Sequence, residues 1–165
     1  FKKLRNNMID GYDRNKSMPM AGFAAGPCLY KDTAQLNAFL KNSFKLGIAA
    51  TKINQSFPKV IYDKIKKKFG KKLKSKKIGI LGIAFKSDID DTRDSLSIDL
   101  LKFLRSKSLK VNISDDYVKN KEIVDKIKLI NESDIIILGV PHSSYRKIKI
   151  PKNKFLVDSW GFFEK

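Results

Sequence analysis

Apolar residues in the first half of the chain recur at three- and four-residue intervals, after a loop rich in Gly, Pro and Ala. They are Leu36, Leu40, Phe44 and Ile48, then Ile53, Phe57, Ile61 and Ile65. This spacing predicts two amphipathic helices. Gly47 is the expected break between them, although glycine can also lie inside a helix at some cost in stability. Pro58 should kink the second helix or make it restart near Phe57, because proline lacks a backbone donor and clashes with the preceding turn.

The pattern changes in the second half, where short apolar runs alternate with helical segments. Strands are predicted at 78–85, 109–113, 135–140 and 155–157, and helices at 95–106 and 121–130. Strand, helix, strand, helix, strand is typical of right-handed crossovers on a parallel sheet. The predicted fold class is therefore α/β, with a helical segment followed by an open, Rossmann-like parallel sheet.

A basic run, Lys64–Lys77, separates the two patterns and marks the expected domain boundary. Residues 1–70 would form the helical unit and residues 71–165 the nucleotide-binding α/β domain. Ligands of such sheets bind beyond the carboxyl ends of the strands. Those ends carry Phe85–Lys86, Asp115–Asp116 and Pro141–His142.

Composition excludes a disordered polycation, because 42% of the 165 residues are hydrophobic and can form a core. The 35 Lys and Arg exceed the 17 Asp and Glu, which gives a net charge of +18. Such an excess suggests an anionic partner: nucleic acid, a membrane surface or a phosphorylated small molecule. A compositional bias towards Lys, Ile and Asn explains it equally well. The basic run contains a single aromatic residue, Phe69, which argues against specific recognition of single strands.

The chain has no run of about 18 apolar residues, and its start lacks the apolar stretch of a signal peptide. We therefore predict a cytoplasmic protein that does not enter a membrane. Cys28 is the only cysteine, so it forms no internal disulfide. The first residue is Phe within a charged, helix-like pattern, and we expect the sequence to be part of a longer protein.

Two candidate features of the α/β half are weak. The pair Gly79-x-x-Gly82 lacks the full glycine pattern of a dinucleotide fingerprint, and close packing of a helix on the strand is the preferred interpretation. Asp115 ends the second strand, where an acid often meets a ribose hydroxyl. A solvated turn carboxylate is an equal alternative. No function follows from either feature alone.

The loop 85–95 carries six charged residues between a predicted buried strand and a helix. They are Lys86, Asp88, Asp90, Asp91, Arg93 and Asp94. Asp94 or Ser95 is a candidate N-cap. Lys86 and Arg93 are suited to bind phosphates, Lys as a point charge and Arg through its bidentate fork. The alternative is a surface loop whose charges compensate one another.

The segment GFAAGPCLYKDT at 22–33 joins a loop of small residues to a predicted helix, whose first-turn amides can hold an anion. A cysteine near such a terminus becomes nucleophilic, and Lys31 would reinforce this for Cys28. Asp32 is placed to orient a water or accept a proton. On physical grounds alone, a single cysteine is more often a small buried hydrophobic residue than a nucleophile.

Four blocks in this order resemble the UDP-glucose/GDP-mannose dehydrogenase family. They are GFAAGPCLYKDT at 22–33, a long helix containing Pro58, KIGILGIAFKSDIDDTRDS at 77–95 and VNISDDYV at 111–118. The resemblance implies an NAD-dependent nucleotide-sugar 6-dehydrogenase that oxidises a UDP-sugar, of UDP-glucose or UDP-N-acetylhexosamine type, to the uronic acid. It also implies that the helices at 34–69 belong to a central dimerisation element, and hence a homodimer.

The resemblance implies a role for each matching residue. Cys28 would attack the aldehyde intermediate to give a thiohemiacetal and then a thioester, and Asp32 would help water to hydrolyse it. Lys31 and Arg93 correspond to residues that contact NAD. The nucleotide sugar would be bound by Phe85 and Lys86 and by the backbone of Phe23, Ala24, Ala25 and Gly26.

Two departures from the family limit these expectations. The amino-terminal NAD-binding domain and the helix that supplies a catalytic Lys and Asn have no counterpart in the 165 residues, so we expect no turnover by this chain alone. Trp160 also stands where many members have an Arg that contacts the sugar nucleotide. The alternatives are a catalytically inactive nucleotide-binding paralogue and a basic nucleic-acid-binding module.

Overall fold

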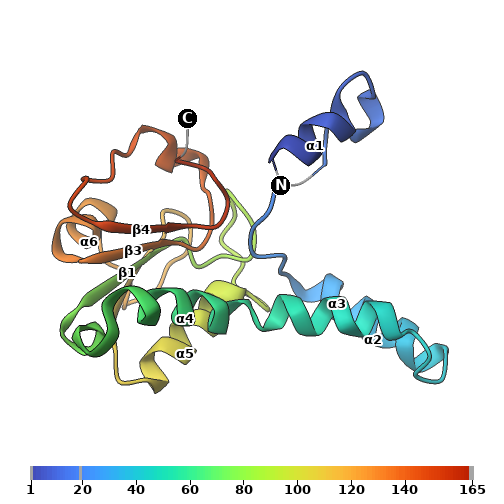
Figure 1. Ribbon diagram of the computed structural model, residues 1–165, viewed down its shortest axis with the longest axis horizontal. Coiled ribbons are helices and arrows are strands. Elements are labelled where there is room, and N and C mark those ends of the chain that lie inside the picture. Colours follow the sequence, from blue (N-terminus) through green and yellow to red (C-terminus); the bar gives the residue numbers. More distant parts are fainter. Residues whose placement is uncertain (1, 19, 164–165) are drawn as a thin grey trace.

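A four-stranded parallel sheet forms the centre of the protein, in a computed structural model that describes residues 2–18 and 20–163 (Figure 1). The strands are β1 (Lys77–Leu81), β2 (Lys110–Ser114), β3 (Ile135–Leu138) and β4 (Phe155–Asp158), in the order β2-β1-β3-β4. Every pair is parallel, with Ile78 of β1 level with Val111 on one side and Ile135 on the other. The predicted α/β class with an open parallel sheet is confirmed.

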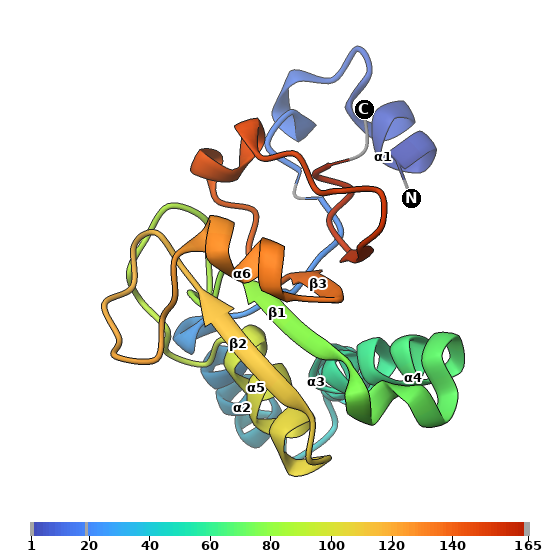
Figure 2. The ribbon, with the colours of Figure 1, turned by 90° about the vertical axis from the view of Figure 1, so that its left-hand side faces the viewer.

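Helices cover both faces of the sheet, which explains why β1 and β3 are nearly continuous runs of buried apolar residues. Helices α4 (Phe57–Phe69) and α5 (Leu96–Ser106) lie on one side of the strands and α6 (Lys126–Glu132) on the other (Figure 2). Ile61 and Ile65 of α4 share one hydrophobic cluster with Leu100 of α5 and with the strands. The long helix upstream of the sheet is therefore part of the core of the α/β unit.

Helices α1 (Lys2–Ile9), α2 (Pro27–Phe39) and α3 (Lys45–Gln55) precede α4. The restart at Phe57 is confirmed. The predicted break at Gly47 is wrong, because the chain turns at 40–44 and Gly47 lies inside α3. The ring of Phe44 folds over Gly47, where a Cβ atom would lie 2.0 Å from the ring, and this contact requires a glycine. No described helix has the length and hydropathy to cross a bilayer.

Three predicted elements are shorter or displaced, and one of them is the strand predicted at 135–140, which ends at Leu138. The strand predicted at 78–85 ends at Leu81, since Gly82 has a φ of +85° and turns the chain beside Val140. The helix predicted at 121–130 begins only at Lys126, because the Asp125 carboxylate accepts the first free backbone N–H groups and acts as N-cap. Three short 3-10 helices complete the elements that the structure describes: η1 (Asp13–Asn15), η2 (Gly70–Ser75) and η3 (Ser143–Lys147).

Candidate functional site

Cys28 lies in the first turn of α2, behind Gly26 as N-cap and Pro27. Its side chain is exposed. Lys31 and Asp32 follow at i+3 and i+4 and therefore share its face of the helix. The Lys31 Nζ lies 3.5 Å from the Asp32 Oδ1, and both side chains are largely in solvent. The structure thus brings together three of the residues that the sequence singled out.

The loop after β1 meets the backbone next to Cys28. A Cβ atom on Gly26 would lie 2.8 Å from the ring of Phe85, and the Gly26 N–H donates to the Asp94 carbonyl at 3.4 Å. Gly26 has a φ of +116°, so both its conformation and this contact favour glycine. Two sequence-predicted groups, the cysteine loop and the phenylalanine, are therefore neighbours although 59 positions separate Gly26 and Phe85.

Arg93 makes a bidentate ion pair with Asp91, with the Nη2 group 2.7 Å from Oδ2. Hydrogen bonds and charge within the pair raise the pKa of Arg93 and lower that of Asp91, and an ionised Cys28 would add to the effect on the pKa of Arg93. Arg93 and Cys28 are thus within electrostatic reach of each other. Arg93 and Asp91 do compensate each other, as the alternative for this loop supposed, while Lys86 is exposed at the same edge of the sheet.

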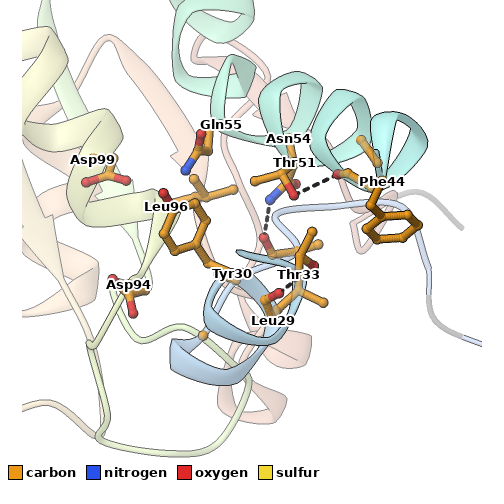
Figure 3. A pocket seen from close by; sticks show the side chains of 15 residues that line it. Leu29, Tyr30, Thr33, Phe44, Thr51, Asn54, Gln55, Asp94, Leu96 and Asp99 are labelled. Carbon is orange, nitrogen blue, oxygen red and sulfur yellow. Dashed lines mark hydrogen bonds between the residues drawn. The ribbon is translucent and has the colours of Figure 1, made fainter. Parts of the chain in front are cut away.

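A cavity of 550 Å³ opens between α2, α3 and the start of α5 (Figure 3). Ala24, Ala25 and Gly26 line it together with Tyr30, whose ring points between the helices towards Leu96. Cys28 is not among its described lining residues. The sequence-predicted sugar loop therefore borders a real cavity, while the thiol belongs to the other face of α2.

The loop before Cys28 is held from the helical side as well. The Asn54 Nδ2 group of α3 donates to the Ala24 carbonyl at 2.5 Å. Phe23 is 4% exposed and packs edge-on against Phe57, with 5.3 Å between ring centroids. Any contact of Phe23 with a ligand must therefore come from its backbone, as the sequence analysis expected.

Asp115 is neither a solvated turn carboxylate nor free for a ribose, because the structure buries it and bonds both its oxygens. Oδ2 accepts the backbone N–H groups of Ile83 and Ala84, and Oδ1 accepts those of Tyr117 and Val118. Burial alone would raise the pKa of Asp115, but these bonds and one from His142 lower it to about 2. Asp115 thus fixes the start of the loop that carries Phe85.

His142 completes this buried network. Its Nδ1 faces the backbone N–H of Asp88 at 2.9 Å and its Nε2 lies 3.0 Å from Asp115. An atom that faces an N–H group must accept, so the ring proton is on Nε2 and is donated to Asp115. Asp88 in turn accepts the N–H and hydroxyl of Ser143, and the first of these bonds lowers its pKa most. The ends of β1, β2 and β3 are therefore tied together.

Gly79 explains the weak glycine pattern. A Cβ atom there would lie 2.4 Å from the side chain of Leu129 on α6, so the preferred interpretation, close packing of a helix on the strand, is confirmed. The chain after Gly82 forms a loop up to Ser95 rather than the helix that a dinucleotide fingerprint requires. Within the described ranges, no group of three or more His, Cys, Asp or Glu residues is arranged to hold a metal ion.

Sequence reasoning missed two residues that hold the site. The sequence gives no sign of the role of Asn54, because a single polar residue in an amphipathic helix is ordinary. Trp160 was noted only as the replacement of an expected Arg, yet its Nε1–H donates to the Gly139 carbonyl at 3.1 Å and its ring covers Gly22. The second contact joins the last strand to the cysteine loop, which no local pattern encodes.

Comparison with known proteins agrees with this geometry. Residues 79–165 match the UDP binding domain of the UDP-glucose/GDP-mannose dehydrogenase family. The UDP-glucose 6-dehydrogenase of Rickettsia bellii is 29% identical over 170 residues, covering 92% of this chain and 39% of the relative. The UDP-N-acetyl-D-mannosamine dehydrogenase of Campylobacter jejuni is 30% identical, over 67% of this chain and 30% of the relative.

Solved structures show the same fold. The UDP-D-ManNAc dehydrogenase of Pyrococcus horikoshii superposes with a TM-score of 0.80 at 23% identity, over 99% of this chain and 41% of its own. The NDP-N-acetyl-D-galactosaminuronic acid dehydrogenase of Methanosarcina mazei gives a TM-score of 0.68 at 29% identity, over 79% and 31%. The chain thus spans about two fifths of the length of the Rickettsia bellii and Pyrococcus horikoshii proteins.

Proposed function

This chain belongs to the UDP-glucose/GDP-mannose dehydrogenase family, and we propose that it supplies the nucleotide-sugar-binding and thiol-bearing part of an NAD-dependent nucleotide-sugar 6-dehydrogenase. Residues 71–165 would bind the nucleotide of a UDP-sugar, and residues 1–70 would carry the nucleophile. One observation supports this most: the backbone of Gly26, two positions before Cys28, packs on Phe85 at the carboxyl edge of the sheet. A nucleotide bound at that edge would place its sugar near the thiol.

Two side chains on one face of α2 suit the conversion of the aldehyde to the acid: Cys28 suits formation of the thioester, and Asp32 suits its hydrolysis. The Cys28 thiolate would add to the carbonyl carbon of the aldehyde, and the carbonyl oxygen would take up a proton to give a thiohemiacetal. Loss of hydride from that carbon together with loss of the hydroxyl proton leaves a thioester. Asp32, one turn further along the same face, would accept a proton from the water that hydrolyses the thioester and frees the thiol.

NAD accepts the hydrides when it is bound, and the described residues fit an anionic cofactor in one respect. Lys31 and Arg93 are exposed cations near Cys28, and either could contact a pyrophosphate. The Gly79–Gly82 turn does not fit the pyrophosphate, because no helix begins there. We therefore propose that the 165 residues contribute to a cofactor site without completing it, and that they do not turn over substrate alone.

A homodimer through α2, α3 and α4 is part of the proposal. These helices expose large apolar side chains, with Phe39 83%, Leu46 79% and Ile53 71% accessible. An exposed set of this size marks an interaction surface more often than a free one. We propose a cytoplasmic location, in keeping with a single free cysteine.

Thermal-shift titration tests the binding step. UDP and a UDP-sugar should raise the melting temperature by about 5–10 °C near 100 times Kd, since such binding adds about 2.7 kcal/mol. The shift should survive an increase in salt, whereas lysine-driven binding of an oligonucleotide would not. Stabilisation by the oligonucleotide alone would favour the nucleic-acid-binding alternative. Phe85→Ala should abolish the UDP shift, with Phe103→Ala, near the carboxyl end of α5 where its ring packs edge-on against Tyr62, as the aromatic control.

Turnover is tested separately. The chain mixed with NAD and a UDP-sugar should give no NADH absorbance, and reduction of NAD would contradict the proposed incompleteness. When the amino-terminal segments of the family are fused in front of it, the chain should form the acid. The Cys28→Ala variant of that fusion should transfer at most one hydride and should form no acid. Undiminished acid formation by Cys28→Ala would refute the nucleophile. Inactivity of the fused protein with intact UDP binding would favour the inactive paralogue.

A further inference from the structure

The indole ring of Trp160 lies against the backbone of Gly22, six residues before Cys28. A Cβ atom on Gly22 would lie 2.1 Å from the Cε3 atom of the ring, so the contact allows no side chain at position 22. Trp160 is partly buried and packs against both hydrophobic clusters of the protein. The ring therefore joins the start of the cysteine loop to the core of the α/β unit.

Trp160 is itself fixed by the ends of two strands. Its Nε1–H donates to the carbonyl of Gly139, which follows β3 directly. Its backbone N–H donates to Oδ1 of Asp158, the last residue of β4, and Oδ2 of the same carboxylate accepts the Phe163 N–H at 2.8 Å. A side chain bonded at both its ring and its backbone has little rotational freedom.

Gly139 also lies where the ligand site of such a sheet is expected. A Cβ atom on Gly139 would lie 2.3 Å from the Gly82 carbonyl, so the chain segments that leave β3 and β1 touch at this point. In the order β2-β1-β3-β4 this is where the chain changes direction across the sheet, and ligands of open α/β sheets bind there. Trp160 thus bridges that edge of the sheet and the cysteine loop, and its size sets how far apart they lie.

The α/β unit holds the loop at its two ends and α3 holds it in the middle. Phe85 contacts Gly26 at one end and Trp160 contacts Gly22 at the other, while Asn54 bonds the Ala24 carbonyl between them. If Trp160 were removed, the loop would lose its attachment at Gly22 and keep those at Phe23, which is buried in the core, and at Gly26. Its amino-terminal end would then be free to move, and the rest of the loop would be held to the α/β unit by fewer contacts.

We propose that Trp160 is a positioning residue for Cys28: it fixes the loop 22–26 relative to the carboxyl edge of the sheet. The inference deepens the proposed function, because it assumes that the thiol must stand at a set distance from a nucleotide bound at that edge. Cys28 touches the reacting carbon in this scheme, and Trp160 acts through the loop.

The single cysteine makes the test direct, since a nitroxide label attaches to Cys28 only. In the 165-residue chain, Trp160→Ala should narrow the spectrum of the label and speed hydrogen exchange of the 22–26 amides at least tenfold, at a temperature where the variant is fully folded. Trp160→Phe keeps a ring over Gly22 and should stay within about threefold of the parent protein. Phe162→Ala removes a neighbouring aromatic ring of the same terminal segment and should leave the loop unchanged.

An unchanged spectrum and unchanged exchange in folded Trp160→Ala would overturn the proposal, as would equal loosening by Phe162→Ala, which indicates general destabilisation. If Trp160→Ala does not fold, Gly22→Ala takes its place: the bond to Gly139 holds the ring, so the added methyl cannot fit against it and should displace the start of the loop from Trp160. A rigid loop in Gly22→Ala also overturns the proposal. None of these measurements uses turnover, so failure of Cys28 as nucleophile would be detected separately.

Discussion

His142 donates its Nε2 proton to the carboxylate of Asp115 at 3.0 Å, and both side chains are completely buried. Tyr117 stacks on one side of the imidazole and Tyr145 packs edge-on against it, with centroids 4.8 and 5.2 Å away. Both residues of the pair bond to the loop that carries Phe85, Asp115 at Ile83 and His142 at Asp88. Its hydrogen bonds to that loop make it the support on which the proposed nucleotide contacts rest.

Asp115→Asn should lower the free energy of unfolding by about 3 kcal/mol or more. The carboxylate accepts backbone N–H groups at both oxygens, and an amide group would turn one acceptor into a donor facing other donors. Urea denaturation measures the loss. Asp63→Asn is the control: it breaks only the exposed ion pair with Lys59 on α4 and should cost less than about 1 kcal/mol. Equal losses would show that Asp115 is not the anchor of the loop.

The stability of the protein should fall between about pH 4 and pH 2. The pKa of Asp115 is about 2 in the folded protein, below the ordinary 3.8, because hydrogen bonds outweigh burial. A lowered folded-state pKa gives stability that is complete above the unfolded pKa and is lost as the pH falls through the folded one. The contribution is about 2 kcal/mol. Denaturation curves at several pH values should show this decline, and Asp115→Asn should flatten it.

Two glycine substitutions separate steric overlap from backbone strain. Gly139→Ala would place a Cβ atom 2.3 Å from the Gly82 carbonyl, at an ordinary φ, and should cost about 3 kcal/mol. Gly70→Ala has open space but a φ of +54° with a ψ of −130°, a combination that side chains rarely adopt, and should cost about 2 kcal/mol. Thermal unfolding of both variants checks the order. A Gly139→Ala protein as stable as the parent would mean that the ends of β1 and β3 can separate freely.

The sequence was most informative where one local pattern decides the structure. Alternating apolar runs located every strand of the sheet, and Ser95 was foreseen as a cap: its Oγ accepts the Ser97 N–H at the start of α5. Local patterns failed where a distant residue decides. Gly47 lies inside α3, where the lack of a side chain lets the Phe44 ring pack against it, and the strand from Ile78 stops early because Gly82 turns beside Val140.

The same distinction holds for the candidate site. The i, i+3, i+4 relation of Cys28, Lys31 and Asp32 follows from helical spacing alone, so the sequence could predict their common face. The contacts of Gly26 with Phe85 and of Gly22 with Trp160 join segments 59 and 138 positions apart. Such pairings depend on the order of the strands in the sheet, and no window of sequence contains them.

Asp91→Asn should strengthen the binding of phosphate compounds without weakening the fold. Arg93 is exposed and bidentate to Asp91, so an anion must compete with that carboxylate for the guanidinium. Removal of the exposed pair should change stability by less than about 1 kcal/mol, and affinity for pyrophosphate or NAD should rise by up to about fivefold. Isothermal titration at low salt measures the gain in affinity, and Arg93→Gln should weaken the binding instead.

Asp63→Asn makes the same charge change on α4, in the exposed pair with Lys59, and should leave affinity unchanged. If both aspartate variants bind more tightly to the same extent, the effect is general charge, and Arg93 does not contact the anion.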